Sequence, residues 1–335
     1  MTTWYIKDDH QAGLAPLSDL RASFEHRTGG VTTLERISKR LGTLPSGFLC
    51  DDPLRAKMIA SRTGLAIVEK ASSELGDHPE IKTPWDILSH LPALLAEDLA
   101  QAEPLNSEVA AETTGEHRID VHEMASILQG VVLDANDGAI RIEEGAVIRS
   151  NAVLVGPCWI GKYCTITDGA LVKSNTVLGP HCKVGGEVGG TIFQGYANKS
   201  HDGHLGDSVI GEWVNLGAGT TNSNLLNTYG DVIVQDLSGK RHRTERQFVG
   251  CFIGDHAKFA ISSTIMTGTI VGTGAMVATT SYTPSPTKRF AWITDAGERT
   301  YHIEKFLAVA KTVMSRRDIE LDSATEAVLR NLASR

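Results

Sequence analysis

The sequence predicts a mainly β fold in which most of the chain winds into a parallel β-solenoid. Three observations predict it: a branched aliphatic residue recurs every six positions, a small residue lies two positions before it, and Gly, Asn or Asp residues supply turns. A step of six fits neither the helical period of 3.6 nor the simple alternation of a strand. It does fit a triangular coil, in which each wall takes about six residues.

The first block of the repeat runs without interruption. Its aliphatic positions are Ile142, Ile148, Leu154, Ile160, Ile166, Val172, Leu178 and Val184. Its small positions are Ala146, Ala152, Cys158, Cys164, Ala170, Thr176 and Cys182. Three walls make a coil of about 18 residues, so residues 18 apart are expected to stack at about 4.8 Å. Ile142, Ile160 and Leu178 should form one such inward ladder, and Cys164 should stack on Cys182 as a buried thiol.

A second block keeps the same step after a break. Ile210 and Leu216 lie six apart, and the repeat resumes at Ile253, Phe259, Ile265, Val271 and Val277. Residues 229–247 do not follow the repeat and are expected to loop out of the solenoid. We therefore assign residues 116–290 to the solenoid, with a loop at about 229–247.

The two ends of the chain lack the repeat. Residues 1–115 read as a reduced α/β region, with helices expected over Asp52–Gly76 and over Trp85–Glu103, the latter with a possible interruption at Pro92. Residues 291–335 read as a helical cap over the open solenoid end. Its first helix is expected within Thr300–Arg317, and a capping box of Ser323 and Glu326 is expected to begin its second.

Composition excludes several functional classes. The 335 residues carry a formal charge of −8, which disfavours nucleic acid as a partner, and the basic run Gly239–Arg246 reads as a solvated loop. There is no signal-peptide core and no apolar run of membrane-spanning length, so we expect a soluble, cytoplasmic protein without a membrane partner. Five cysteines without a CxxC pair indicate thiols rather than disulfides.

Three features carry a resemblance to a known family. The hexapeptide blocks, "SHDGHLGDSVIGEWVNLGAGT" and "GDHAKFAISSTIMTGTIVG" resemble the acetyltransferase half of the bifunctional enzyme that makes UDP-N-acetylglucosamine, and its sugar-nucleotidyltransferase-like relatives. The resemblance extends over about residues 117–335 and is patchy near the N-terminus. It implies a left-handed β-helix, a homotrimer, acetyl-CoA as co-substrate and a sugar-like acceptor.

The resemblance also implies roles for individual residues. The string "NKSH" places His201 on the family's general base, and His204 falls on a tyrosine that touches the sugar phosphate. In "VNLGAG", Asn215 falls on a substrate contact and Ala218 on a residue near the acyl-CoA. His256 and Lys258 are further candidates on the cofactor side.

The chemistry of acyl transfer assigns the remaining candidates. Histidine suits the base because its ordinary pKa of about 6.5 lies near working pH. Asp202 is expected to orient the imidazole or to bind acceptor hydroxyls, and backbone amides in Leu216–Thr220 to bind the oxyanion. The polar groups expected to contact a sugar-like acceptor are Asn198, Lys199, Asn222, Asn224 and Tyr229.

Departures from the family pattern limit these inferences. The N-terminal region lacks the glycine-rich nucleotide loop and is about half as long as a nucleotidyltransferase domain, so we expect no nucleotidyl transfer. The stretch "CKVGGEVGGTIF" offers Glu187 where the family has a lysine, which leaves the acceptor open.

Two other functions stay open. The chain could be a non-catalytic sugar-nucleotide-binding or scaffold protein. It could instead resemble the zinc carbonic anhydrases of the γ class, if His201, His204 and His256 converged. The motifs favour the acetyltransferase, and no metal is expected.

Overall fold

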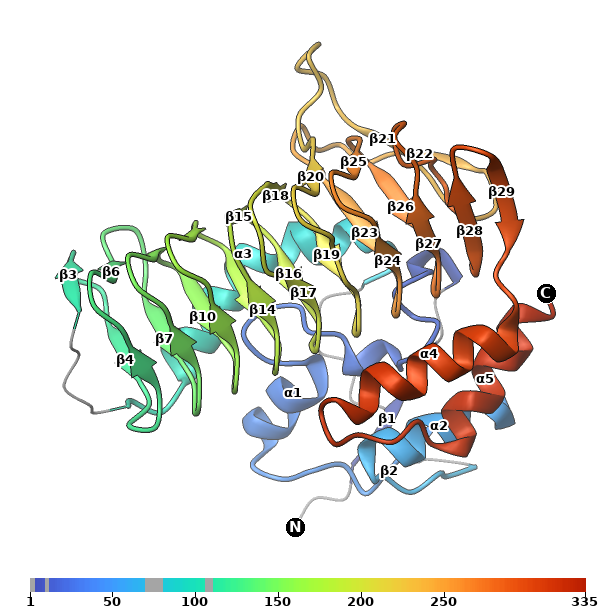
Figure 1. Cartoon of the computed structure of the whole chain (residues 1–335). Helices are drawn as coiled ribbons and strands as arrows, with labels where there is room; N and C mark the ends of the chain where they lie inside the picture. Colours follow the sequence, from blue (N-terminus) through green and yellow to red (C-terminus); the bar gives the residue numbers. More distant parts are fainter. Residues whose placement is uncertain (1–3, 10–11, 70–80, 106–110) are drawn as a thin grey trace.

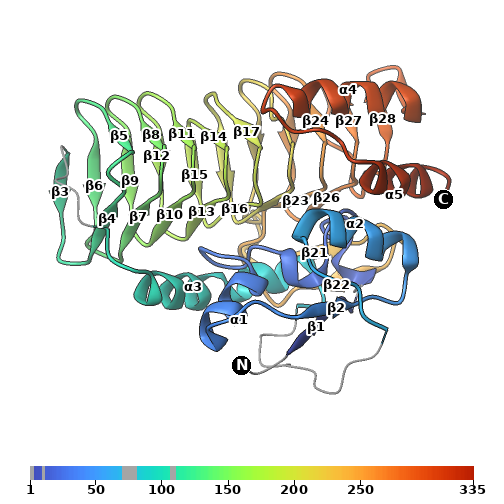
Figure 2. The same ribbon diagram turned by 90° about the horizontal axis from the view of Figure 1, so that it is seen from below.

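The computed structural model describes residues 4–9, 12–69, 81–105 and 111–335, and most of them form one long three-walled solenoid (Figure 1). Strands of successive coils pair in parallel, and tight corners join the walls. Followed through Figures 1 and 2, the coils wind left-handed. The predicted left-handed parallel β-helix with an α/β N-terminal region and C-terminal helices is confirmed.

We name the three walls by the size of their main sheets. The eight-stranded wall contains β4 (Ile119–Val121), β7 (Ile140–Ile142), β10 (Cys158–Ile160), β13 (Thr176–Leu178), β16 (Ile192–Phe193), β19 (Val209–Ile210), β23 (Cys251–Ile253) and β26 (Thr269–Val271). The five-stranded wall contains β5 (Ser126–Ile127), β8 (Val147–Ile148), β11 (Thr165–Ile166), β14 (Lys183–Val184) and β17 (Asn198–Lys199). The six-stranded wall contains β3 (Glu112–Thr114), β6 (Val132–Asp134), β9 (Val153–Val155), β12 (Leu171–Val172), β15 (Glu187–Gly189) and β18 (His204–Gly206).

Two smaller sheets lie in the C-terminal coils. One contains β24 (Lys258–Phe259), β27 (Met276–Ala278), β28 (Ala291–Thr294) and β29 (Gly297–Thr300). The other pairs β20 (Thr221–Asn222) with β25 (Thr264–Ile265). Isolated bridges from Asn198 to Asn215 and from Asn215 to Lys258 connect the five-stranded wall to the first of these sheets.

The inward ladders follow the predicted period. Ile142, Ile160 and Leu178 pair side by side on the eight-stranded wall and are fully buried. Cys164 and Cys182 stack one coil apart, and both are buried free thiols. Aliphatic residues of all three walls meet in one core cluster. The six-residue step is therefore the packing period of this core.

The N-terminal region packs against the eight-stranded wall (Figure 2). Its elements are β1 (Tyr5–Lys7), β2 (Gly47–Leu49), α1 (Thr33–Leu41), α2 (Pro53–Thr63) and α3 (Pro84–Gln101). Apolar residues of α3 share a buried cluster with Val177 and Phe252 of the wall. A buried ion pair of 2.6 Å between Arg21 and Asp255 also joins this region to a solenoid corner. The region therefore covers one of the three walls.

Two helix predictions in this region need correction. The helix expected over Asp52–Gly76 ends at Thr63, because Gly64 adopts the left-handed conformation (φ 70°) that terminates helices. Residues 70–76 of that prediction lie outside the described residues. The other helix, α3, continues through Pro92 without a break.

Two helices follow the solenoid, namely α4 (Ile303–Ser315) and α5 (Ser323–Ala333). They share a buried cluster with Phe290 and with the N-terminal region, while β29, the last strand of its sheet, is exposed along its length. The capping box predicted at Ser323 is wrong by one residue. The N-cap is Asp322, whose carboxylate accepts hydrogen bonds from the amides of Ala324 and Thr325. A carboxylate at this position also interacts favourably with the helix dipole.

Between β20 and β23 the chain leaves the coils. An antiparallel hairpin of β21 (Ile233–Gln235) and β22 (Arg241–Arg243) lies in this excursion. Val232 and Val234 join the buried cluster that includes Phe252 and Ile270, so the hairpin covers the C-terminal part of the eight-stranded wall. None of the described helices combines the length and apolar composition needed to traverse a bilayer.

Candidate active site

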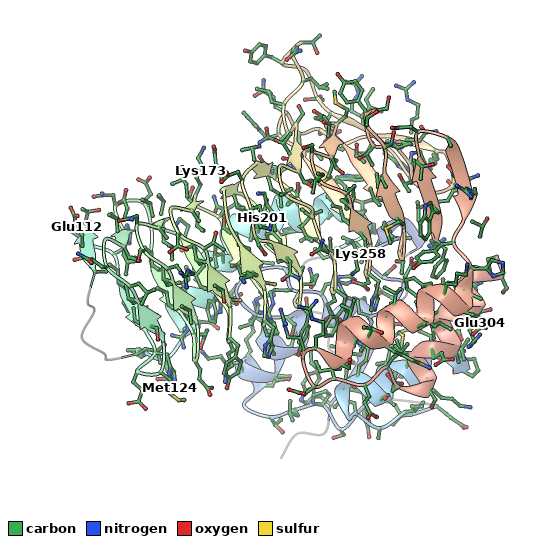
Figure 3. The ribbon with its side chains drawn as sticks, in the orientation of Figure 1. Glu112, Met124, Lys173, His201, Lys258 and Glu304 are labelled. Carbon is green, nitrogen blue, oxygen red and sulfur yellow. The ribbon has the colours of Figure 1, made fainter. Side chains whose placement is uncertain are left out.

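A shallow hollow lies at the corner that joins the five-stranded wall to the six-stranded wall. Its volume is about 540 Å³, and corner residues of successive coils line it: Thr167, Asp168, Ser200, His201, Asp202, Ala218, Gly219, Ile261 and Ser262. Figure 3 shows His201 between Lys173, which is nearer the N-terminal coils, and Lys258, which is nearer the C-terminal coils. We call this space the His201 hollow.

One shortened corner creates the His201 hollow. Paired positions of β11 and β12, and again of β17 and β18, lie six residues apart, whereas those of β14 and β15 lie four apart. Gly185 and Gly186 form this short corner. A Cβ on Gly185 would lie 2.2 Å from the Thr167 Oγ1 atom, and one on Gly186 would lie 2.7 Å from the Gly203 carbonyl oxygen. The corner is therefore recessed between two full-length corners, and glycine allows the close approach.

His201 and Asp202 lie in the full-length corner on one side of this recess. Both side chains are exposed, and within the described residues the imidazole of His201 has no hydrogen-bond partner. Ala218, one coil later, lines the same space. The structure thus brings together three of the residues predicted from the motifs and leaves the imidazole accessible.

Two of the backbone amides in the predicted oxyanion segment already donate hydrogen bonds within the protein. The amide of Leu216 donates to the Asn198 carbonyl at 2.8 Å, and the amide of Thr220 donates to the Gly217 carbonyl at 3.1 Å. The candidate oxyanion donors in this segment are therefore the amides from Gly217 to Gly219, which lie next to the lining residue Ala218.

Lys199 points into the solenoid instead of into the hollow. It pairs beside Val184 on the five-stranded wall and is 1% exposed. Its ammonium donates to the carbonyls of Gly185 at 3.0 Å and His201 at 2.8 Å. Burial lowers the pKa of Lys199 to about 8. This side chain does not reach a ligand in the hollow.

Asn198, Asn215 and Lys258 form an outward column along the five-stranded wall and its continuation. The Oδ1 atom of Asn198 is buried without a partner among the described residues. The ammonium of Lys258 donates to the Trp213 carbonyl, and burial lowers its pKa to about 8. These residues lie on the wall and do not line the His201 hollow.

A second, polar recess lies at the far end of the six-stranded wall. Its lining includes Lys173, His204, Asp207, Asn224 and Phe248. Asn224 donates to the Asp207 carboxylate at 2.7 Å, and burial raises the pKa of Asp207. The Nε2 atom of His204 lies 3.9 Å from Glu187, which accepts a 3.0 Å hydrogen bond from Lys173.

Asn222 lies beneath this recess and has a packing role. It is 6% exposed. Its amide group donates to the Gly206 carbonyl at 2.9 Å and to the Ser208 hydroxyl at 3.1 Å, and its Oδ1 atom accepts from the Gly206 amide at 2.9 Å. With both its donor and acceptor groups engaged, Asn222 is placed to shape the floor of the recess.

The last two candidates lie elsewhere. Tyr229 is 69% exposed at the start of the excursion. His256 is 4% exposed and lies between the rings of Trp213 and Phe306, with centroid separations of 6.2 and 5.7 Å. Burial lowers the pKa of His256 to about 3. His256 therefore packs between the solenoid and α4 as a neutral ring.

The three histidines of the zinc alternative do not converge within one chain. His201, His204 and His256 line three different spaces. Across the described ranges, no group of three or more His, Cys, Asp or Glu residues is arranged to hold a metal ion.

Sequence reasoning missed several residues of these sites. Asp168 and Ser262 line the His201 hollow from coils before and after it, and Lys173 places a cation in the second recess. Reading the corners coil by coil, instead of one motif at a time, would have brought them out.

Comparison with known proteins gives a partial match. No protein-family model matches the chain. It is 36% identical over 142 residues to a bifunctional sugar-1-phosphate nucleotidylyltransferase/acetyltransferase of Sulfurisphaera tokodaii, a match that covers 42% of this chain and 35% of the relative. It is 31% identical over 142 residues to the bifunctional protein GlmU of Methanococcus maripaludis, which covers 42% of this chain and 34% of that protein.

The chain thus spans about a third of the length of the curated relatives it matches. Among solved structures, a mutant perosamine N-acetyltransferase from Caulobacter crescentus, in complex with CoA and GDP-perosamine, aligns over 89% of this chain and 96% of that chain. The identity is 12% and the TM-score is 0.16. The sequence relatives and the solenoid together confirm the resemblance to hexapeptide-repeat acetyltransferases.

Proposed function

We propose that this protein transfers an acyl group, most simply acetyl, from coenzyme A to an amine or hydroxyl of a sugar-like acceptor. The observation that carries the proposal is the His201 hollow, where an accessible imidazole faces a space made by a shortened coil. The relatives support it: one is named a sugar-1-phosphate nucleotidylyltransferase/acetyltransferase, and the other is the bifunctional protein GlmU.

In the proposed reaction, His201 accepts the proton of the attacking amine or hydroxyl. The nucleophile forms a bond to the thioester carbonyl carbon, the carbon–sulfur bond breaks, and CoA leaves as a thiol after receiving a proton. Amides from Gly217 to Gly219 stabilise the oxyanion, and Asp202 orients the imidazole or binds an acceptor hydroxyl.

The acceptor is proposed to extend along β18 from the His201 hollow towards the second recess. His204 begins this strand, and Lys173 and Asn224 lie at its far end. Lys173 is paired with Glu187 and Asp207 also lines this recess, so its hydrogen-bonding groups suit the hydroxyls of a sugar, whether free, phosphorylated or linked to a nucleotide.

A homotrimer is the proposed assembly. The His201 hollow is open, and the N-terminal region, α3 and the excursion already cover the eight-stranded wall. A second copy would therefore have to approach the five- or six-stranded wall, which flank the hollow, and would complete a groove for the pantetheine arm.

Purified protein and acetyl-CoA test the proposal. Release of the CoA thiol should depend on an acceptor from a panel of amino sugars, amino-sugar phosphates and nucleotide-linked amino sugars, and acetyl-CoA alone should raise the melting temperature. Stabilisation by a nucleotide sugar without acetyl-CoA binding or turnover would instead favour the non-catalytic binding protein. Loss of stability on chelation of zinc would favour the carbonic anhydrase alternative.

A further inference from the structure

Lys199 occupies a position that the solenoid otherwise gives to apolar residues. Val184 lies beside it in the preceding coil, and the bridge between Asn198 and Asn215 places Leu216 beside it in the next. Val184 and Leu216 are buried in the core, and Lys199 itself is 1% exposed. A buried ammonium is costly unless its donors are satisfied, so its partners indicate what it does.

Those partners are the backbones of the two corners that define the His201 hollow. One hydrogen bond goes to the carbonyl of Gly185 in the shortened corner, and the other goes to the carbonyl of His201 in the full-length corner. The ammonium thus joins the recessed corner to the corner that carries the imidazole. Hydrogen bonds from a charged donor are roughly twice as strong as neutral ones.

Main-chain and hydroxyl groups also hold these two corners. The amide of Gly185 donates to the Lys199 carbonyl at 2.7 Å, the amide of Glu187 donates to the Gly203 carbonyl at 3.2 Å, and the amide of His204 donates to the Thr221 hydroxyl at 3.3 Å. The last two distances are at the long end of the usual range. The amide of Leu171 also donates to the Gly186 carbonyl at 2.8 Å, and the bond between Gly185 and Lys199 joins main-chain atoms. The Lys199 side chain therefore adds the two hydrogen bonds of its ammonium, which link one corner to the other.

We infer that Lys199 is a positioning residue, which fixes the backbone of His201 from inside the solenoid and so sets where the imidazole stands in the hollow. The inference rests on the proposed acyl transfer only for its effect on catalysis. The structural part, that the buried ammonium holds the corner, stands independently. It replaces the expectation that Lys199 contacts the acceptor.

Lys199→Met is the decisive variant, because methionine fills a similar volume and restores an apolar ladder. Methionine removes the cost of burying a charge but leaves the carbonyls of Gly185 and His201 without this donor, so the melting temperature should change little. Hydrogen exchange at the amides of Gly185, Glu187 and His204 should nevertheless be faster by about tenfold or more. A side chain with a merely structural role would lower stability as well.

Turnover separates positioning from binding. In Lys199→Met, kcat should fall by between about tenfold and a hundredfold, since small misplacements of a reacting group are costly. The KM for acetyl-CoA should stay within about twofold of the wild type. Lys183→Met is the matched control: it makes the same change at an exposed position of the same wall, one coil earlier, and should alter neither exchange nor kcat.

Each outcome decides a separate point. Unchanged exchange in the Met variant overturns the inference, whatever the turnover, and faster exchange with unchanged kcat overturns the positioning role. If the wild type transfers no acyl group, the proposed function fails, and exchange alone decides whether Lys199 holds the corner. If the Met variant does not fold, Lys199→Gln replaces it, because glutamine keeps a neutral hydrogen-bond donor. Exchange at the three amides should then be faster than in the wild type, but by less than the tenfold expected for loss of the ammonium. Exchange at the wild-type rate overturns the inference.

Discussion

The direction in which a side chain points decides what it does in this solenoid. His201 and Lys199 are two residues apart, yet one lies in solvent and the other in the core. The motif "NKSH" predicted both as site residues because it carries no information on direction. The repeat does carry that information: Lys199 lies six residues after the buried Phe193 and six before the buried Leu205, and Asn222 lies six after Leu216.

Replacing His201 tests the proposed base. His201→Ala should lower kcat by about 10² to 10⁴, because the proton acceptor is lost, while acetyl-CoA binding is retained. His117→Ala removes an exposed histidine from the first coils and should leave both quantities unchanged. Acceptor-dependent thiol release gives kcat, and titration calorimetry gives the affinity for acetyl-CoA. Full turnover by His201→Ala would assign the base elsewhere.

His256 should make the protein sensitive to acid. Its pKa is about 3 in the folded state, against an ordinary value of 6.5, so the unfolded chain takes up a proton first as the pH falls. This contribution to stability is therefore present above about pH 6.5 and is lost progressively towards pH 3. The neighbouring Asp255 acts in the opposite sense between about pH 6 and 4, because its pKa is raised to about 6 by burial.

The variant His256→Asn isolates this effect, since asparagine tolerates the positive φ of 62° at this corner. The difference in unfolding free energy between wild type and variant should shrink by up to about 1.4 kcal/mol per pH unit below pH 6.5. Urea unfolding between pH 7 and 4 measures it. A difference independent of pH would show that the ring protonates in the folded protein at its ordinary pKa.

At the scale of elements, the shortened corner between β14 and β15 is the feature that makes a site out of a regular repeat. The sequence signal for it is the pair Gly185–Gly186 at the point where the six-residue step fails after Val184. We read that failure as a gap in the pattern. In the structure it is the recess itself, because a corner that is two residues shorter lies deeper than the corners on either side of it.

Gly186→Ala should damage both the corner and the activity. Gly186 and Gly169 have nearly the same backbone conformation (φ 69° and 66°), so alanine strains either by about 1–2 kcal/mol. At Gly186 the new methyl group also meets backbone 2.7 Å away, whereas nothing lies within 4 Å at Gly169. Gly186→Ala should therefore cost at least about 1 kcal/mol more in denaturant unfolding than Gly169→Ala, and should lower turnover. Equal losses of unfolding free energy in the two variants would show that the short corner accommodates a methyl group, contrary to this prediction.

At the scale of the whole molecule, the period of six was sufficient to predict the solenoid and its ladders, whereas the two C-terminal helices were predicted from the helical pattern of their own residues. The period could not predict where the N-terminal region packs against the solenoid. That region is held by α3 on the eight-stranded wall and by buried ion pairs such as Arg21 with Asp255, whose partners lie far apart in the sequence and follow no period. The second recess could not be predicted from the period either, because Lys173 and His204 come from different coils and lie together only because the coils stack.

A structure of the protein with CoA bound tests the central claim most directly, and the quantity to measure is the distance from the CoA sulfur to the imidazole of His201. The sulfur should end in the His201 hollow, within about 3–4 Å of that ring or one water away from it. A thiol that ends beside the second recess, or against the packed ring of His256, would contradict the assignment of the active site.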